Sequence, residues 1–214
     1  MKTLFKNMAI VFTGLTLFSF TDGPPKTVIV DIVDNIETST DQNLTKEFIA
    51  SIDSLNQTQA VKVLDWKEIS NGLDDTKKQN LLDSIQPEII LTVSFKNAKK
   101  DQNTVTAVVS KKSDHLEHST TVARDLTTAF DQNIVKNEGV FQTESDYVQD
   151  NAKPAVFVSI ETKNDQPSNN EIIHTLTDFI TNVNVEQNEV NTNQTEPSDS
   201  TTLQTPKPNE VQIN

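Results

Sequence analysis

The sequence predicts an α/β domain in which a mostly parallel sheet of about five or six strands has helices on both faces. Short apolar segments rich in valine and isoleucine alternate with segments whose apolar residues recur at helical spacing. The strand segments are nearly continuous apolar runs, which is typical of parallel strands covered on both faces. Strands and helices in this order build a parallel sheet through crossover connections.

The strand predictions rest on runs of apolar and β-branched residues. Residues 27–33, Thr-Val-Ile-Val-Asp-Ile-Val, predict a buried strand. Pro87 marks the point where a helix gives way to the apolar run at residues 88–95. The predicted strands are residues 27–33, 61–64, 88–95, 104–110 and 154–160.

Amphipathic helices are predicted between these strands. Val122, Leu126 and Phe130 stand four residues apart, which places them on one face of a helix. Three other segments share this kind of spacing. Their apolar residues are Leu44, Phe48, Ile52 and Leu55 in the first, Leu81, Leu82 and Ile85 within residues 73–86, and Ile173, Leu176 and Ile180 within residues 170–183.

The amino-terminal end of the chain has the pattern of a secretory signal peptide. Lys2 and Lys6 precede an apolar stretch at residues 8–20. This stretch has 13 residues, fewer than the roughly 20 that a membrane-spanning helix needs, so we expect no permanent membrane span. The small residues of a cleavage site are poorly marked, which leaves an uncleaved anchor as the alternative.

The carboxyl-terminal end has a different composition again. Residues 184–214 are rich in Asn, Gln, Thr, Glu, Pro and Ser, which predicts a disordered tail, with a short recognition peptide as the alternative. The predicted organisation is a signal peptide at residues 1–21, an α/β domain at residues 22–183 and the tail at residues 184–214. We therefore expect an exported protein, periplasmic or extracellular.

Charge and cysteine content exclude several classes of function. The formal net charge is -13, and without Lys2 and Lys6 of the signal segment it becomes -13 - 2 = -15. Such a chain repels nucleic acid. Arg124 is the only arginine, so no pair of guanidinium groups can clamp a phosphate. The chain has no cysteine, which excludes disulfides, thiolate zinc sites and cysteine nucleophiles.

Three segments carry a resemblance to a known family. Residues 30–35 are Val-Asp-Ile-Val-Asp-Asn, and residues 89–97 are Ile-Ile-Leu-Thr-Val-Ser-Phe-Lys-Asn after a Gln-Pro-Glu. Residues 147–160 contain Tyr-Val and then Pro-Ala-Val-Phe-Val-Ser. In this order they resemble the strands of zinc-dependent N-acetylmuramoyl-L-alanine amidases, which end in Asp-Pro-Gly-His-Gly-Gly, Ser-Ile-His-Ala-Asn and Pro-Ala-Val-Leu-Val-Glu. The resemblance covers about residues 27–183.

The resemblance implies that the family's zinc site is lost here. Asp34 stands for the first ligand histidine, Ser39 for the ligand glutamate, Ser94 for the second histidine and Ser159 for the catalytic glutamate. Zinc is held by His, Cys and carboxylate ligands, and Ser159 without a neighbouring base cannot act as a general base. We therefore expect no catalytic residues, no metal ligands and no cofactor.

Glu161, Asp41 and two histidines are further candidates for this site. Glu161 follows Ser159 by two residues and would share its face of the strand. Asp41 could replace Ser39 in a shifted alignment, which would suit calcium better than zinc. His115 and His118 form a weak metal signal that is more simply explained as solvated residues of a helix's first turn.

The predicted function is that of an exported, non-catalytic relative of the amidases. Asp34, Ser39, Ser94, Ser159 and Glu161 would line a groove for peptidoglycan fragments or for an envelope protein partner. One alternative is an active N-acetylmuramoyl-L-alanine amidase with atypical metal ligands. Another is a structural domain that presents its tail to a component of the envelope.

Overall fold

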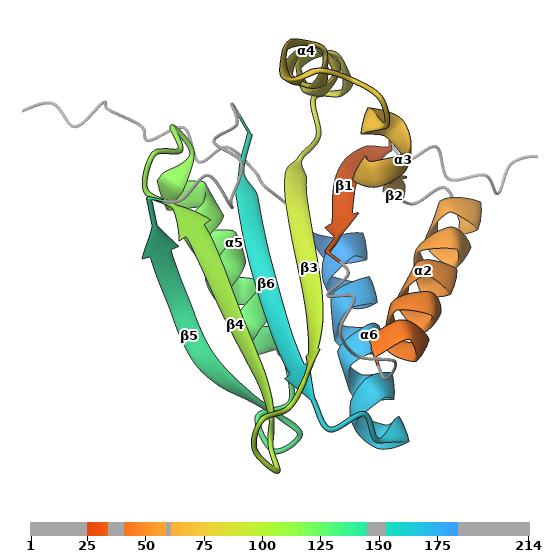
Figure 1. Ribbon diagram of the computed structural model, residues 1–214, viewed down its shortest axis with the longest axis vertical. Coiled ribbons are helices and arrows are strands. Elements are labelled where there is room, and N and C mark those ends of the chain that lie inside the picture. Colours follow the sequence, from red (N-terminus) through yellow and green to blue (C-terminus); the bar gives the residue numbers. More distant parts are fainter. Residues whose placement is uncertain (1–24, 34–40, 59–60, 145–152, 184–214) are drawn as a thin grey trace, which may run out of the picture.

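The computed structural model describes residues 25–33, 41–58, 61–144 and 153–183, which form one sheet of six strands with helices packed on it (Figure 1). The strand order is β2-β1-β3-β6-β4-β5. The strands are β1 (Lys26–Ile32), β2 (Val61–Asp65), β3 (Ile89–Asn97), β4 (Asn103–Ser110), β5 (Val135–Thr143) and β6 (Ala155–Thr162).

The sheet is mostly parallel, as predicted. β2, β1, β3 and β6 run in one direction. β4 pairs with β6 antiparallel, and β5 pairs with β4 parallel, so the last two strands run in the opposite direction (Figure 1). The sequence did not predict this antiparallel pair, because no side-chain pattern in the strand at residues 103–110 reveals the direction of its neighbour.

Helices lie on both faces of the sheet, which confirms the predicted fold class. α2, α5 and α6 contribute side chains to the larger apolar cluster, and α3 and α4 contribute to the smaller one on the opposite side. The helices are α2 (Asp41–Thr58), α3 (Trp66–Ser70), α4 (Asp75–Ile85), α5 (Leu116–Ala129) and α6 (Gln166–Asn182).

The main core lies between the sheet and α2, α5 and α6. Phe48 of α2 meets Phe95 of β3 edge to face, with ring centroids 5.8 Å apart and ring planes at 84°, a favoured aromatic geometry. Buried residues of all three helices join them. The helix residues of the main core include Leu44, Phe48, Val122, Leu126, Ile172, Leu176 and Ile180.

The opposite side of the sheet, which we call the second face, has a smaller apolar cluster. Trp66 of α3 and Leu82 of α4 pack there with Ile29 of β1. On β3 and β6 the buried members of this cluster are Ile90, Ala155 and Phe157. Beyond them, both strands continue with polar residues on the second face.

Aspartates set the starts of three helices. Asp65 accepts hydrogen bonds from the backbone of α3, Asp74 from the backbone of α4 and Asp165 from the backbone of α6, as expected for N-cap residues. α4 ends at Ile85, and its C-cap residue Gln86, directly before Pro87, has a left-handed φ of 50°. The helix predicted at residues 73–86 is therefore slightly shorter in the structure.

Two elements were not predicted. α3 is a single short helix, with too few residues to show an amphipathic period. β5 contains Lys136, Glu138 and Gly139 among its apolar residues. Its sequence therefore lacks the apolar run or regular alternation that predicts a strand. β5 also has a β-bulge, where its register to β4 shifts between Val105 and Thr106.

The predicted signal segment at residues 1–21 and the predicted tail at residues 184–214 lie outside the described residues. In the part of the chain that the structure describes, no helix is both long and apolar enough to cross a membrane.

Candidate functional site

Ser94 and Ser159 lie beside each other on the central strands β3 and β6. They are Cα partners in the parallel register of the two strands. Ser94 is 1% exposed, and Ser159 is partly exposed. The sequence predicted that these serines meet at one end of the sheet, and the structure brings them together. Asp34 and Ser39, the other two positions of the predicted site, lie outside the described residues.

Both serines are on the second face of the sheet. The preceding residues Val93 and Val158 belong to the main core, and successive side chains of a strand point to opposite faces. Thr106 of β4 is the Cα partner of Ser159 on its other side. Ser94, Ser159 and Thr106 therefore form a row of hydroxyl groups across three strands, which we call the hydroxyl row.

Glu161 lies one row further along β6, on the same face as Ser159, as predicted. Its Cα partners are Lys96 on β3 and Thr104 on β4. The Glu161 side chain is 27% exposed, and its Oε1 is 3.9 Å from Nζ of Lys99. An ion pair of this length involving an exposed lysine is weak. The carboxylate of Glu161 is therefore available to a ligand at the edge of the hydroxyl row.

Asp31 on β1 is a further candidate ligand-binding residue, which the sequence interpretation did not include in the site. It is the Cα partner of Thr92, which shares the second face with Ser94. Burial raises the pKa of the Asp31 carboxyl, nearby Lys67 lowers it and nearby Asp65 raises it further. The sequence contains an indication of this role, because Asp31 is an acidic residue within the otherwise apolar first strand.

The described part of the site does not fit a zinc ion. Catalytic zinc takes three His, Cys or carboxylate ligands, and Ser94 and Ser159 offer only hydroxyls. Asp31 and Glu161 are separated by two strand spacings, about 10 Å, and by four residues along the strands, about 13 Å, too far to share an ion. In residues 25–33, 41–58, 61–144 and 153–183, no three His, Cys, Asp or Glu side chains are grouped to hold a metal.

The histidines lie away from this site. His115 and His118 stack with ring centroids 6.3 Å apart and planes at 18°, and His115 is the N-cap of α5. α5 follows β4, which runs antiparallel to β6, so the pair lies toward the opposite end of the sheet from the carboxyl ends of β3 and β6. On α6, Nδ1 of His174 is 3.4 Å from Asp178 in an exposed ion pair.

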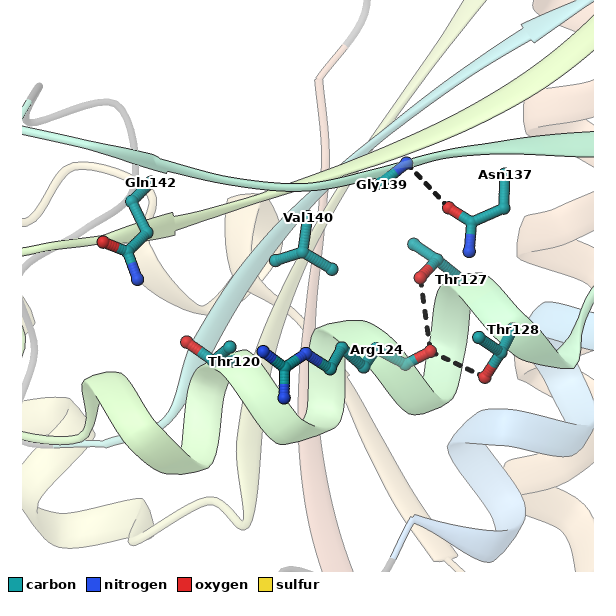
Figure 2. Close-up of a pocket in the computed structure, with 8 residues that line it drawn as sticks. All are labelled: Thr120, Arg124, Thr127, Thr128, Asn137, Gly139, Val140 and Gln142. Atoms are coloured by element: carbon teal, nitrogen blue, oxygen red, sulfur yellow. Dashed lines mark hydrogen bonds between the residues drawn. The ribbon is translucent and has the colours of Figure 1, made fainter.

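Two cavities lined by described residues lie outside the hydroxyl row. One, of about 300 Å³, is between α2 and the strands β1 and β2. The other, of about 380 Å³, is between α5 and β5 (Figure 2). Ser94, Ser159 and Glu161 line neither of them. A groove around these three residues therefore stays a prediction.

Comparison of the sequence with family models and with curated proteins finds no match.

Structural comparison finds amidases. The catalytic domain of CwlV, an N-acetylmuramoyl-L-alanine amidase from Bacillus (Paenibacillus) polymyxa var. colistinus, is similar with a TM-score of 0.53 and 12% identity, over 73% of this chain and 96% of that one. The amidase AmiC2 of Nostoc punctiforme gives a TM-score of 0.52 and 10% identity, over 74% and 97%.

A third similar structure is a complex. The CwlD amidase from Clostridioides difficile, solved with the GerS lipoprotein, gives a TM-score of 0.50 and 14% identity, over 72% of this chain and 96% of that one. These matches support, at the level of the fold, the resemblance that three sequence segments predicted. The chain thus has the fold of the N-acetylmuramoyl-L-alanine amidase catalytic domains.

Proposed function

We propose that this chain is an exported, non-catalytic module that uses the amidase fold to bind peptidoglycan fragments at the second face of its sheet. The observation that carries the proposal is the pairing of Ser94 with Ser159 on β3 and β6. The resemblance places a ligand histidine and the catalytic glutamate of the amidases at these two positions. Two adjacent hydroxyl groups replace them.

The neighbours of Ser159 explain why it supplies no base. Its Cα partners on the two adjacent strands are Ser94 and Thr106, whose hydroxyls stay protonated near neutral pH and cannot take up its proton. General-base catalysis contributes about 10² to 10⁴ in rate. A site without that group, and without ligands suited to a zinc ion, loses both the activated water and the metal's stabilisation of charge.

The same residues are suited to hydrogen bonding. Ser159 and Thr106 are the partly exposed members of the row, and each of their hydroxyls can donate one hydrogen bond and accept through two lone pairs. Glu161 adds an accessible acceptor at the next register position. Sugars and peptide amides present the complementary groups. The net charge of -13 opposes binding of an anionic polymer, which favours the glycan and amide parts of peptidoglycan as the contact.

Two further features belong to the proposal. Lys2, Lys6 and the apolar stretch at residues 8–20 support export. The CwlD amidase was solved in complex with the GerS lipoprotein, so a domain of this fold can also present a surface to another protein. A protein partner in the envelope is the second occupant that the experiment below distinguishes.

The test is sedimentation of the purified protein with insoluble peptidoglycan at physiological salt. Thr106→Val and Ser159→Val each remove one hydroxyl while keeping a side chain that suits a strand. Each should weaken co-sedimentation, and both together should weaken it further. Thr76→Ala is the matched control, because Thr76 is an exposed hydroxyl residue on α4.

The outcomes separate the possible functions. Loss of binding in the two valine variants, with binding kept in Thr76→Ala, supports the proposal. Wild-type protein that stays in the supernatant contradicts peptidoglycan binding and directs the search to a protein partner. Release of stem peptides during the incubation supports the alternative, an active amidase with atypical ligands.

A further inference from the structure

The cavity between α5 and β5 contains the only arginine of the sequence. Arg124 of α5 lines this space of about 380 Å³, with Thr120 on the same helix and Val140 and Gln142 on β5. In Figure 2 the Arg124 guanidinium extends along the helix toward Thr120, while Val140 and Gln142 point from the strand toward the helix. The guanidinium therefore lies against a cavity wall that is mostly polar and uncharged.

The charge of Arg124 is not neutralised within the part of the chain that the structure describes. Its backbone carbonyl accepts hydrogen bonds from Thr127 and Thr128, but its guanidinium has no ion-pair or hydrogen-bond partner there. No acidic residue lines the cavity, although the chain has 31 acidic residues and 18 basic ones. A positive charge left open in such a chain is a site for an anion.

The β-bulge of β5 turns polar side chains into this cavity. Asn137 is the Cα partner of Val105, and Val140 is the partner of Ala107. Both partners belong to the main core, on the side of the sheet that α5 covers. Without the extra residue, Val140 and Asn137 would point to opposite faces, because side chains alternate along a strand. The bulge thus places Asn137, Val140 and Gln142 on the same side.

Two side-chain amides line the same cavity as Arg124, those of Asn137 and Gln142. Oδ1 of Asn137 accepts a hydrogen bond of 2.8 Å from the backbone N–H of Gly139, which leaves the Nδ2 group of Asn137 free to donate. The side-chain amide of Gln142 has no hydrogen-bond partner among the described residues. Gly139 has a φ of +108°, which a residue with a side chain rarely adopts, so the bulge depends on glycine.

We propose that this cavity binds a carboxylate that lies next to an amide, as at the carboxyl-terminal end of a peptide. The planar guanidinium of Arg124 matches the two oxygens of a carboxylate, and Asn137 and Gln142 supply the donors and acceptors that an adjacent amide needs. A phosphate dianion fits less well, because Arg124 is the only charged residue that lines the cavity. This site is separate from the hydroxyl row, and its occupancy does not depend on the function proposed for that row.

The test is an NMR titration of the full-length protein with N-acetyl-glycylglycine, with its carboxyl-terminal amide and with inorganic phosphate. The free carboxylate should shift resonances of α5 and β5, and the amide form should not. Arg124→Gln should weaken carboxylate binding about tenfold or more, since a hydrogen-bonded ion pair contributes roughly 1.5–3 kcal/mol. Lys136→Gln is the matched control, because it removes the same charge from an exposed β5 residue outside the cavity lining.

Each result supports or overturns the proposal. Binding that needs both the carboxylate and Arg124, and that survives in Lys136→Gln, supports it. Equal binding of the peptide and its amide, equal loss in the two variants, or stronger binding of phosphate than of the peptide overturns it. Absence of any shift at millimolar peptide also overturns it. Failure of the peptidoglycan sedimentation leaves this result unaffected, so the two proposals are tested independently.

Discussion

Ser94 and Ser159 lie side by side as Cα partners in the parallel register of β3 and β6. Ser159 is partly exposed, whereas Ser94 is only 1% exposed. Their position on the second face separates them from the main core, which contains the preceding residues Val93 and Val158. The pair thus belongs to the polar continuation of the two central strands and not to the apolar packing. This position makes Ser159 the member of the pair that can contact a ligand.

Zinc should leave the stability of the protein unchanged. A ligand that binds only the folded state raises the free energy of unfolding by RT ln(1 + [L]/Kd), about 2.7 kcal/mol at a hundredfold excess over Kd. The hydroxyls of Ser94 and Ser159 offer no such binding. Thermal unfolding with and without excess zinc checks this expectation. A zinc-dependent increase in Tm that Asp34→Ala removes would show that a metal site persists.

Restoring the four amidase residues should recover zinc binding before turnover. The variant combines Asp34→His, Ser39→Glu, Ser94→His and Ser159→Glu. Because Ser94 is buried, a histidine there must displace its neighbours, and overpacking of this kind costs about 1–3 kcal/mol. Metal capture tolerates such shifts, whereas hydrolysis needs groups held to within about 0.5 Å.

Metal content and stem-peptide release are measured on the same preparation of this fourfold variant. Ser159→Glu alone is its control, and this control should acquire neither zinc nor activity. Turnover in full proportion to bound zinc would show that the surrounding residues still support catalysis.

Asp31→Asn should stabilise the protein near neutral pH. Burial raises the pKa of the Asp31 carboxyl in the folded state, so the unfolded chain loses this proton at a lower pH than the folded chain. Ionisation of Asp31 therefore begins to reduce the free energy of unfolding above the ordinary aspartate pKa of about 3.9. The reduction is complete above the raised pKa.

Urea unfolding of wild type and Asp31→Asn over a series of pH values measures this effect. The advantage of the variant should disappear at pH values below the ordinary aspartate pKa. An advantage that is the same at acidic and neutral pH would mean that the buried charge is not its cause.

Asn103→Ala should strongly destabilise the fold. Asn103 is 3% exposed, donates from Nδ2 to the Ile134 carbonyl at 3.0 Å and to Oγ of Ser168 at 2.8 Å, and accepts from the Lys163 N–H at 2.7 Å. It joins the starts of β4, β5 and α6. Each buried partner left unsatisfied costs about 1–3 kcal/mol, so we expect a total loss of roughly 2–5 kcal/mol.

Urea unfolding measures the loss in Asn103→Ala, and the exposed Asn80 of α4 provides the matched control Asn80→Ala. The control should change the free energy of unfolding by less than about 0.5 kcal/mol. Equal effects of the two substitutions would contradict the role given to Asn103.

The sequence predicted the elements that have strong periodic signals. The apolar runs that became β1, β3 and β6 and the helical spacing of α2, α5 and α6 all lie where expected, because burial on one or both faces dictates these patterns. β5 was not predicted, because it is an edge strand in which Lys136, Glu138 and the bulge at Gly139 interrupt the apolar pattern of a strand. The antiparallel direction of β4 against β6 depends on tertiary pairing, which no local signal encodes.

The candidate site was predictable in part. The sequence placed Ser94 and Ser159 at one end of the sheet because both stand near the carboxyl ends of predicted parallel strands, at positions that the amidase resemblance matches. The structure then shows that these two strands are neighbours. Thr106 of the hydroxyl row could not be found in this way, since its position beside Ser159 follows from the unpredicted antiparallel pair. The cavity at Arg124 could not be predicted from the sequence either, because it depends on β5 and its bulge.

The central claim is that the chain has kept the amidase fold without amidase chemistry. The most direct test is release of stem peptides from purified peptidoglycan by the unmodified chain, assayed across the neutral pH range with and without a metal chelator and beside an active amidase. We predict no release under any of these conditions, because Ser159 lies between Ser94 and Thr106 with no base among its cross-strand partners. Robust release that the chelator abolishes would contradict the claim and identify the chain as an active amidase.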